Sequence, residues 1–209
     1  MRSENNSSFF LFISKIIYIF AQENIKTKDK KMKENFEITS VEDGKKYWIS
    51  RSVATSAFIF KVKDGQLYVL TEIRGSNMHD FPGMRCVPCG YVNWGETVED
   101  ACIREVYEET GLKIDKRELI FEGINSDPST NRQNISIHYS IPLTDDELLS
   151  ISDERGGEVN EVAKLEWVNV DNLPNDFCFN HDKFITQYSC TANLFFGLDF
   201  ESLDVENMF

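Results

Sequence analysis

Three glutamates stand close together in one short segment, and their spacing suits metal chemistry. Glu105, Glu108 and Glu109 occupy positions i, i+3 and i+4, which fall on one side of an α-helix within reach of a shared cation. Carboxylate oxygens are hard ligands that suit Mg²⁺ or Mn²⁺, and these ions bridge to substrate phosphates. The segment therefore predicts a divalent-metal site that handles a phosphorylated substrate.

The helix that must carry these glutamates is predicted over residues 97–110. Thr97 can cap its first turn together with Asp100, in the spacing of a capping box. Gly111 follows the last periodic residue and can adopt the left-handed conformation that ends a helix. Together the two signals predict where the helix begins and where it ends.

On a helical wheel, Glu105 and Glu109 lie inside the apolar stripe of this helix, and Glu108 lies at its edge. An unpaired carboxylate in such a stripe costs several kcal/mol or is neutralised. Arg104 is the one cationic residue within the predicted helix. The stripe therefore needs a further counter-charge, and a bound metal ion would provide it.

Residues 90–112 resemble the signature of the Nudix hydrolases, G-x5-E-x7-R-E-U-x-E-E-x-G-U, where U is a bulky aliphatic residue. The chain matches every constrained position: Gly90, Glu96, Arg104, Glu105, Val106, Glu108, Glu109, Gly111 and Leu112. A weaker resemblance extends over roughly residues 52–188, with Pro88-Cys89-Gly90 where the family usually has Pro-Gly-Gly.

The resemblance implies a Mg²⁺-dependent hydrolase, with Mn²⁺ as an alternative ion, that cleaves the diphosphate of a nucleoside diphosphate linked to a group X. ADP-ribose, a sugar nucleotide or an NTP-like molecule would fit. The catalytic residues carried over are Arg104, Glu105, Glu108, Glu109 and Glu161. The metal ligands carried over are Glu105, Glu108, Glu109, Glu161 and a backbone carbonyl at Cys89 or Gly90. The general base stays open among Glu108, Glu109 and Glu161.

Two other functions are compatible with the same fold. One is a nucleotide-binding regulator that does not hydrolyse its ligand, although such proteins usually have an eroded signature and here it is intact. A regulator would also need a DNA-binding region, and neither a basic segment nor a helix-turn-helix pattern follows Tyr188. The other is an isomerase whose product retains the diphosphate.

The elements that must position the helix predict an α/β fold. Residues 52–62 and 67–73 form a hairpin around the Asp64-Gly65 turn, and further strands are predicted over 118–124, 135–141 and 163–170. A second amphipathic helix begins near Asn180. With the resemblance, this order indicates a Nudix-type α/β/α sandwich with a mixed β-sheet. Residues 144–161 are predicted to form an acidic loop, and His138 is assigned to a solvated sheet face.

The chain of 209 residues suits one domain. We assign residues 1–40 to a leader or disordered extension, with Met32 as an alternative translation start, and residues 41–209 to a Nudix hydrolase domain. The apolar segment 9–21 is interrupted by Lys15, lacks a cleavage site and is too short to span a bilayer.

The net charge of −13 disfavours nucleic acid polymers and anionic membranes as partners. A small nucleotide substrate is expected instead, and a homodimer stays open. The five cysteines form no regular framework, which favours a reducing cytoplasm. A structural zinc site at the pair Cys86 and Cys89 with Cys178 and His181 is the weaker alternative.

Overall fold

The computed structural model describes residues 35–129, 134–144 and 161–198. The chain divides into two units between Ser50 and Arg51. In the first unit, β1 (Phe36–Thr39) and β2 (Lys46–Ile49) form an antiparallel pair. The predicted leader over residues 1–40 lies mostly outside the described residues and stays a prediction.

The second unit is built on one mixed sheet. Its strands are β3 (Ser52–Lys63), β4 (Gln66–Arg74), β5 (Arg85–Cys86), β6 (Cys89–Tyr91), β7 (Ile120–Asn125), β8 (Asn134–Pro142) and β9 (Val162–Asn169). The order is β5-β4-β3-β8-β7, with β6 paired to β3 and β9 paired to β4. The pairing of β3 with β8 is parallel, and the other pairings among the described residues are antiparallel.

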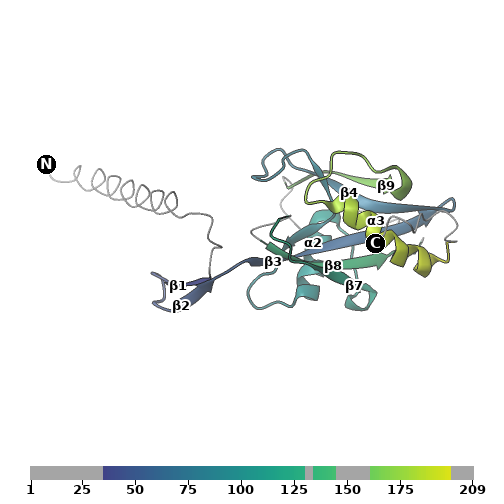
Figure 1. The fold of residues 1–209 in the computed structure, drawn as a ribbon. Coiled ribbons are helices and arrows are strands. Elements are labelled where there is room, and N and C mark those ends of the chain that lie inside the picture. Colours follow the sequence, from purple (N-terminus) through teal and green to yellow (C-terminus); the bar gives the residue numbers. More distant parts are fainter. Residues whose placement is uncertain (1–34, 130–133, 145–160, 199–209) are drawn as a thin grey trace. The chain divides into compact units, whose positions relative to one another are not determined.

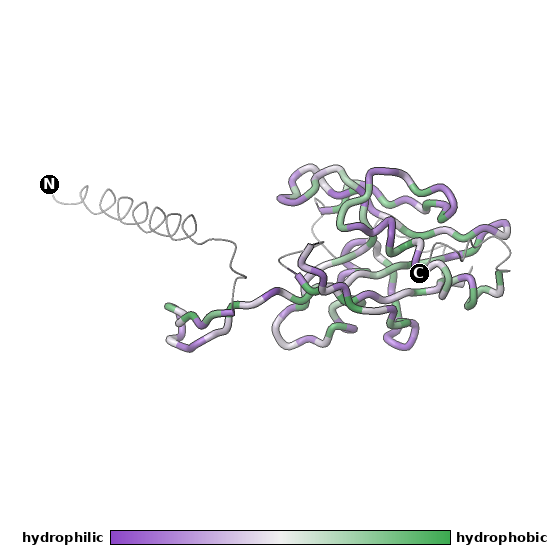
Figure 2. Tube along the Cα trace, in the orientation of Figure 1, coloured by the Kyte–Doolittle hydropathy of each residue, from purple (hydrophilic) through white to green (hydrophobic). Residues whose placement is uncertain are grey.

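Among the described residues, two α-helices pack on this sheet: α2 (Val98–Thr110) and α3 (His181–Phe196) (Figure 1). Short 3-10 turns, η1 (Lys116–Glu118) and η3 (Val170–Asn172), follow α2 and β9. Hydrophobic residues follow the central strands, whereas many of the connecting turns are hydrophilic (Figure 2). The predicted α/β sandwich with a mixed sheet is confirmed.

The central strand β3 sends alternate side chains into two separate cores, because successive residues of a strand point to opposite faces. Ala57 and Ile59 pack in the cluster that includes Cys102 and Val106 of α2. The intervening side chains pack in the cluster formed with α3, which contains Phe58, Phe60, Val69, Ile185, Tyr188 and Ala192. One helix therefore covers each face of the sheet.

The predicted hairpin of β3 and β4 is present. Asp64 and Gly65 both have positive φ, 52° and 75°, as a type I′ turn requires. The backbone twist of this turn matches that of the flanking strands. Next to this turn, β4 is held in register with β3 from Lys63↔Gln66 to Phe60↔Val69.

The assignment of His138 to a solvated face was wrong. Its side chain is 1% exposed, and Nδ1 lies 2.8 Å from the Tyr188 hydroxyl. Helix α3 covers the face that the alternating pattern of β8 left as polar, and burial lowers the pKa of His138 to about 4. Among the described residues, no helix is both long and apolar enough to cross a membrane.

Candidate active site

Helix α2 positions the glutamates, and its ends are fixed as predicted. The Thr97 side chain accepts a hydrogen bond from the backbone N–H of Asp100. Gly111 ends the helix with φ of 78° and donates its N–H to the carbonyl of Tyr107. These caps satisfy backbone groups that a helix end would otherwise leave unpaired, so both ends of α2 are well defined.

Arg104 connects the helix to the loop that precedes it. Its Nε and Nη2 donate to the two carboxylate oxygens of Glu96 at 3.1 and 2.8 Å. Its Nη2 also donates to the carbonyl of Tyr91 at 3.0 Å. The Arg104 guanidinium holds the pKa of Glu96 below its usual range. Arg104 and Glu96 therefore fasten the loop that follows Gly90 against α2.

The same guanidinium orients two of the predicted metal ligands. Arg104 Nη1 donates to Glu105 Oε1 at 2.8 Å and to Glu108 Oε2 at 2.9 Å. The Glu105 side chain is only 14% exposed, whereas that of Glu108 is 36% exposed. Burial raises the pKa of Glu105 although Arg104 opposes the shift. Glu105 is therefore a half-buried carboxylate, and Arg104 is its cationic partner among the described residues.

Glu109 is the most buried of the three helix glutamates, at 7% exposure. Its Oε2 accepts a hydrogen bond from the backbone N–H of Cys89 at 2.8 Å. Burial, followed by the negative charge of Glu72, raises its pKa well above the usual range. No salt bridge to Glu109 is present within the described ranges.

Gly90 lets the backbone of β6 approach the Glu105 carboxylate very closely. A Cβ atom at this position would lie 2.1 Å from Glu105 Cδ, well inside van der Waals contact. The φ of Gly90 is not in the positive region, so the glycine is needed for space and not for backbone conformation. This contact places the Glu105 carboxylate beside the backbone at Gly90.

Glu161 lies in an exposed turn immediately before β9. Its backbone carbonyl accepts the N–H of Gly75 at 2.6 Å, which holds this end of the loop against the end of β4. Its negative charge raises the pKa of both Glu72 and Glu105. Glu161 is therefore within electrostatic reach of the helix carboxylates, while the rest of the predicted acidic loop, residues 145–160, lies outside the described residues.

Glu72 of β4 is a site residue that sequence reasoning missed. It is 1% exposed, and its Oε1 accepts the Cys86 thiol at 3.0 Å. Burial raises its pKa to about 7. The available signal was a single carboxylate within the otherwise apolar strand run LYVLTEI, where an ordinary buried strand would have an aliphatic residue.

As these side chains stand, no three His, Cys, Asp or Glu residues of the described ranges converge closely enough to hold a metal ion. Arg104 directs Glu105 and Glu108 toward itself, and Glu109 is turned to the N–H of Cys89. The donors are nevertheless all oxygens, which suits Mg²⁺. Glu109 is buried within electrostatic reach of Glu72, and Glu105 is half-buried. The residues present therefore fit a divalent cation.

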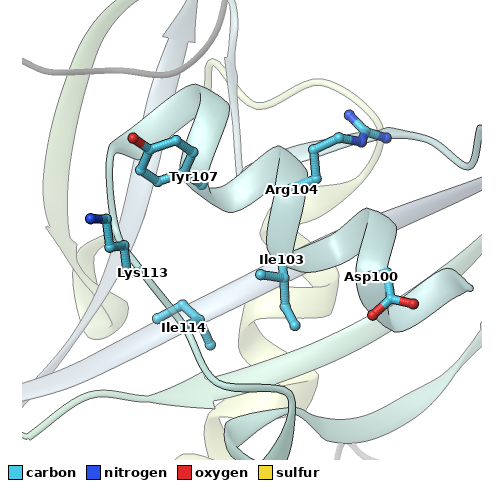
Figure 3. Close-up of a pocket in the computed structure, with 6 residues that line it drawn as sticks. All are labelled: Asp100, Ile103, Arg104, Tyr107, Lys113 and Ile114. Atoms are coloured by element: carbon cyan, nitrogen blue, oxygen red, sulfur yellow. The ribbon is translucent and has the colours of Figure 1, made fainter. Parts of the chain in front are cut away.

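A shallow surface hollow lies on the opposite, outer side of α2 (Figure 3). Its lining residues are Asp100, Ile103, Arg104, Tyr107, Lys113 and Ile114. Only Arg104 is shared with the carboxylate cluster, and residues 100, 103 and 107 lie about half a turn from Glu105 and Glu109 on the helix. We therefore place the candidate active site at the carboxylate cluster and not in this hollow.

Solved structures share this fold. A MutT/nudix family protein from Enterococcus faecalis matches with a TM-score of 0.55 at 15% identity, covering 92% of this chain and 76% of that protein. The NUDIX domain of Shewanella oneidensis NrtR, solved with ADP ribose, matches with a TM-score of 0.55 at 18% identity, covering 81% and 97%. At these identities the likeness establishes an α/β fold of the Nudix type.

Sequence similarity then gives the family. The NUDIX domain model matches residues 50–188. An ADP-ribose pyrophosphatase from Methanocaldococcus jannaschii is 31% identical over 157 residues, which cover 73% of this chain and 82% of the relative. The chain belongs to the Nudix family and is a pyrophosphohydrolase acting on phosphorus-containing anhydrides.

Proposed function

We propose that the chain is a Mg²⁺-dependent hydrolase that cleaves the diphosphate linkage of ADP-ribose, with Mn²⁺ as a substitute ion. The observation that carries the proposal is the pair Glu105 and Glu109: Glu109 is buried and accepts the N–H of Cys89, and the half-buried Glu105 carboxylate lies beside the backbone at Gly90. Buried charges need compensation, and a cation that also binds diphosphate oxygens would supply it. The relative named as an ADP-ribose pyrophosphatase supports the substrate.

The ion would be held by Glu105, Glu109 and the backbone carbonyl at Cys89 or Gly90, with Glu108 and Glu161 as further ligands. When bound, it would neutralise the diphosphate and lower the pKa of the attacking water. An all-oxygen set that leaves room for waters agrees with the preference of Mg²⁺. Mg²⁺ is therefore the ion to supply first in an assay.

The residues of the chain would then position the ligands and accept a proton. Arg104 acts as a positioning residue, because its guanidinium holds Glu105 and Glu108 while it is fixed by Glu96. A carboxylate among Glu108, Glu109 and Glu161 accepts the proton of the attacking water. Hydrolysis of ADP-ribose by this route would release AMP and ribose 5-phosphate.

We also propose the cytoplasm as the compartment and a small nucleotide as the partner. All five cysteines are free thiols, which supports a reducing environment. The net charge of −13 supports a small substrate neutralised by metal in preference to a nucleic acid polymer.

The test is hydrolysis of a substrate panel in the presence of Mg²⁺: ADP-ribose, sugar nucleotides, dinucleoside polyphosphates, NADH and (d)NTPs. We expect ADP-ribose to be split fastest. Glu109→Gln should lower the rate by at least about 100-fold, because even the loss of a group that supports a metal ligand costs about 10- to 100-fold. Glu99→Gln is the matched control on the same helix, since Glu99 is partly exposed and lies outside the carboxylate cluster; it should keep the wild-type rate.

The outcomes separate the alternatives. Faster cleavage of another panel member would replace ADP-ribose as the substrate. Calorimetric binding of ADP-ribose without cleavage of any member would favour the nucleotide-binding regulator, and a product that retains its diphosphate would favour the isomerase. Equal activity of the wild-type and Glu109→Gln proteins would remove the role proposed for the helix carboxylates.

A further inference from the structure

One carboxylate oxygen beside the candidate active site has no partner. Glu72 Oε2 is buried and makes no hydrogen bond within the described part of the chain, and the residue as a whole is 1% exposed. The other oxygen, Oε1, accepts the Cys86 thiol at 3.0 Å. This bond fixes the orientation of the carboxylate and leaves Oε2 as its unsatisfied atom.

The backbone connects Glu72 directly to the segment that contacts Glu109. Glu72 of β4 is paired in register with Cys86 of β5. Cys89 follows at the start of β6, and its N–H donates to Glu109 Oε2 at 2.8 Å. The Glu72 and Glu109 side chains thus approach the same short stretch of chain, one from the sheet and the other from α2.

The electrostatic interaction between Glu72 and Glu109 agrees with their approach to the same stretch of chain. Among the neighbouring charges, that of Glu72 raises the pKa of Glu109 the most. The positive charge of Arg74 lowers the pKa of Glu72, and the smaller effects of Glu105 and Glu161 raise it. Glu72 therefore belongs electrostatically to the group formed by the predicted metal ligands, although it lies outside the signature segment.

Arg74 is the nearby cation, but its guanidinium contacts groups other than Glu72. Its Nε donates to the carbonyl of Asp80 at 3.0 Å, its Nη1 lies 4.0 Å from the Cys86 sulfur, and its guanidinium lies over the Phe179 ring. No salt bridge joins Arg74 to Glu72 in the described ranges. Two buried carboxylates, Glu72 and Glu109, are thus left without a salt bridge among the described residues. In the ionised form they are costly unless a cation is bound, and without a cation they are neutralised by protons, in line with their raised pKa values.

We propose that Glu72 is a further metal ligand of this active site, binding a divalent cation through Oε2 from the sheet side while Glu109 binds it from α2. The inference rests on the proposed function, because it assigns one more residue to the same metal site. Oxygen is the ligand atom that Mg²⁺ and Mn²⁺ require. The Cys86 thiol then acts as a positioning group that holds Oε1 and turns Oε2 to the ion.

The first test measures Mn²⁺ binding by isothermal titration calorimetry without substrate. Glu72→Gln retains the size of the side chain and an oxygen that can accept the Cys86 thiol, and it removes the charge. We expect it to weaken Mn²⁺ binding by about 10- to 100-fold, as other changes around metal sites do. Circular dichroism of the same samples verifies the fold.

Glu122→Gln is the matched control. Glu122 is also a strand glutamate with one buried carboxylate oxygen, Oε1, that lacks a hydrogen bond in the described residues. Its Oε2, however, accepts the Thr191 hydroxyl of α3 at 3.1 Å, on the face of the sheet away from α2. This variant should bind Mn²⁺ as the wild-type protein does, which would show that an orphaned oxygen alone has no effect.

A second measurement does not depend on the stability of a variant. In a crystal of the wild-type chain grown with Mn²⁺, the anomalous peak should lie about 2.1 Å from Glu72 Oε2. The proposal is overturned if the ion is bound by the helix glutamates with Oε2 outside its coordination shell. It is also overturned if folded Glu72→Gln binds Mn²⁺ with wild-type affinity.

These outcomes are distinct from failure of the proposed function. If the wild-type protein splits ADP-ribose and Glu72→Gln binds Mn²⁺ normally, only the role of Glu72 is lost. If the Mn²⁺ site includes Oε2 but no panel member is hydrolysed, the role of Glu72 is retained and the proposed hydrolysis is rejected.

Discussion

Replacing Gly90 with alanine should lower the hydrolytic activity while leaving the free energy of unfolding nearly unchanged. A Cβ atom at Gly90 would lie 2.1 Å from Glu105 Cδ, and ordinary contacts begin near 3.4 Å. The carboxylate would therefore have to move by about 1.3 Å, the difference between these distances. A misplacement of about 1 Å at a reacting centre costs on the order of 100-fold in rate. We expect Gly90→Ala to lose activity by about that factor.

Stability should respond differently. The obstructing atom is the far end of a flexible side chain, and Gly90 does not have a positive φ. Alanine at a compatible glycine position stabilises by roughly 0.4–1 kcal/mol by reducing the freedom of the unfolded chain. Urea denaturation should therefore show a free energy of unfolding for Gly90→Ala that is close to the wild-type value.

Gly65→Ala is the matched control, which should lower stability and leave activity unchanged. Gly65 has φ of 75° and no atom within 4 Å of an added Cβ, and it lies in the turn between β3 and β4. An alanine there should cost about 1–2 kcal/mol of stability and leave the rate per folded molecule unchanged. Both variants would be compared by their initial rates on the substrate that the panel identifies, and by their Mn²⁺ affinity measured by titration. Wild-type activity in Gly90→Ala would refute the close approach of Glu105 to the backbone.

Three further predictions concern other parts of the site and core. Arg104→Lys keeps the charge but cannot bond Glu96, Glu105 and Glu108 together; its rate should fall about 10- to 100-fold in the same assay, and an unchanged rate would contradict its positioning role. Thr97→Ala removes the N-cap of α2 and should lower the free energy of unfolding by about 1 kcal/mol, as measured by urea denaturation; equal midpoints would show that the cap is dispensable. His138 has a folded pKa of about 4, below its ordinary 6.5, so protonation favours the unfolded state. The contribution of neutral His138 to the free energy of unfolding is therefore fully present above pH 6.5. As the pH falls toward 4, roughly 3 kcal/mol of it is lost. His138→Gln should reduce this loss in denaturation curves recorded across that range, and identical pH profiles would exclude the contribution.

Local signals in the sequence were enough to predict the catalytic helix and the first hairpin. Thr97 and Gly111 fix the ends of α2 through contacts made with near neighbours in the chain. The Asp64-Gly65 turn is similarly local. Helix periodicity alone placed Glu105 and Glu109 in the apolar stripe, and in the structure Glu109 is buried and Glu105 half-buried. These features were predictable because they depend on residues a few positions apart.

Features that depend on distant segments were not predictable in the same way. The parallel pairing of β3 with β8 joins segments that are separated by α2 and β7, and no residue pattern in either strand specifies its partner. His138 was misplaced because its burial depends on α3, whose packing face was not known. Glu72 was missed because one carboxylate in a strand has no periodic context, and its neighbours come from β5, α2 and the turn at Glu161.

The parallel pairing of β3 and β8 also has a consequence for how the protein folds. From Ser52 to Asn134, the intervening chain forms a large loop that must close before the pairing can form, and closing such loops slows folding. This loop contains α2, so the helix can form early while the sheet that supports it is still incomplete. A nascent chain that has not yet been synthesised through Pro142 therefore lacks the strand that completes the centre of the sheet. We expect the late β3–β8 closure to limit the rate at which newly made molecules become active.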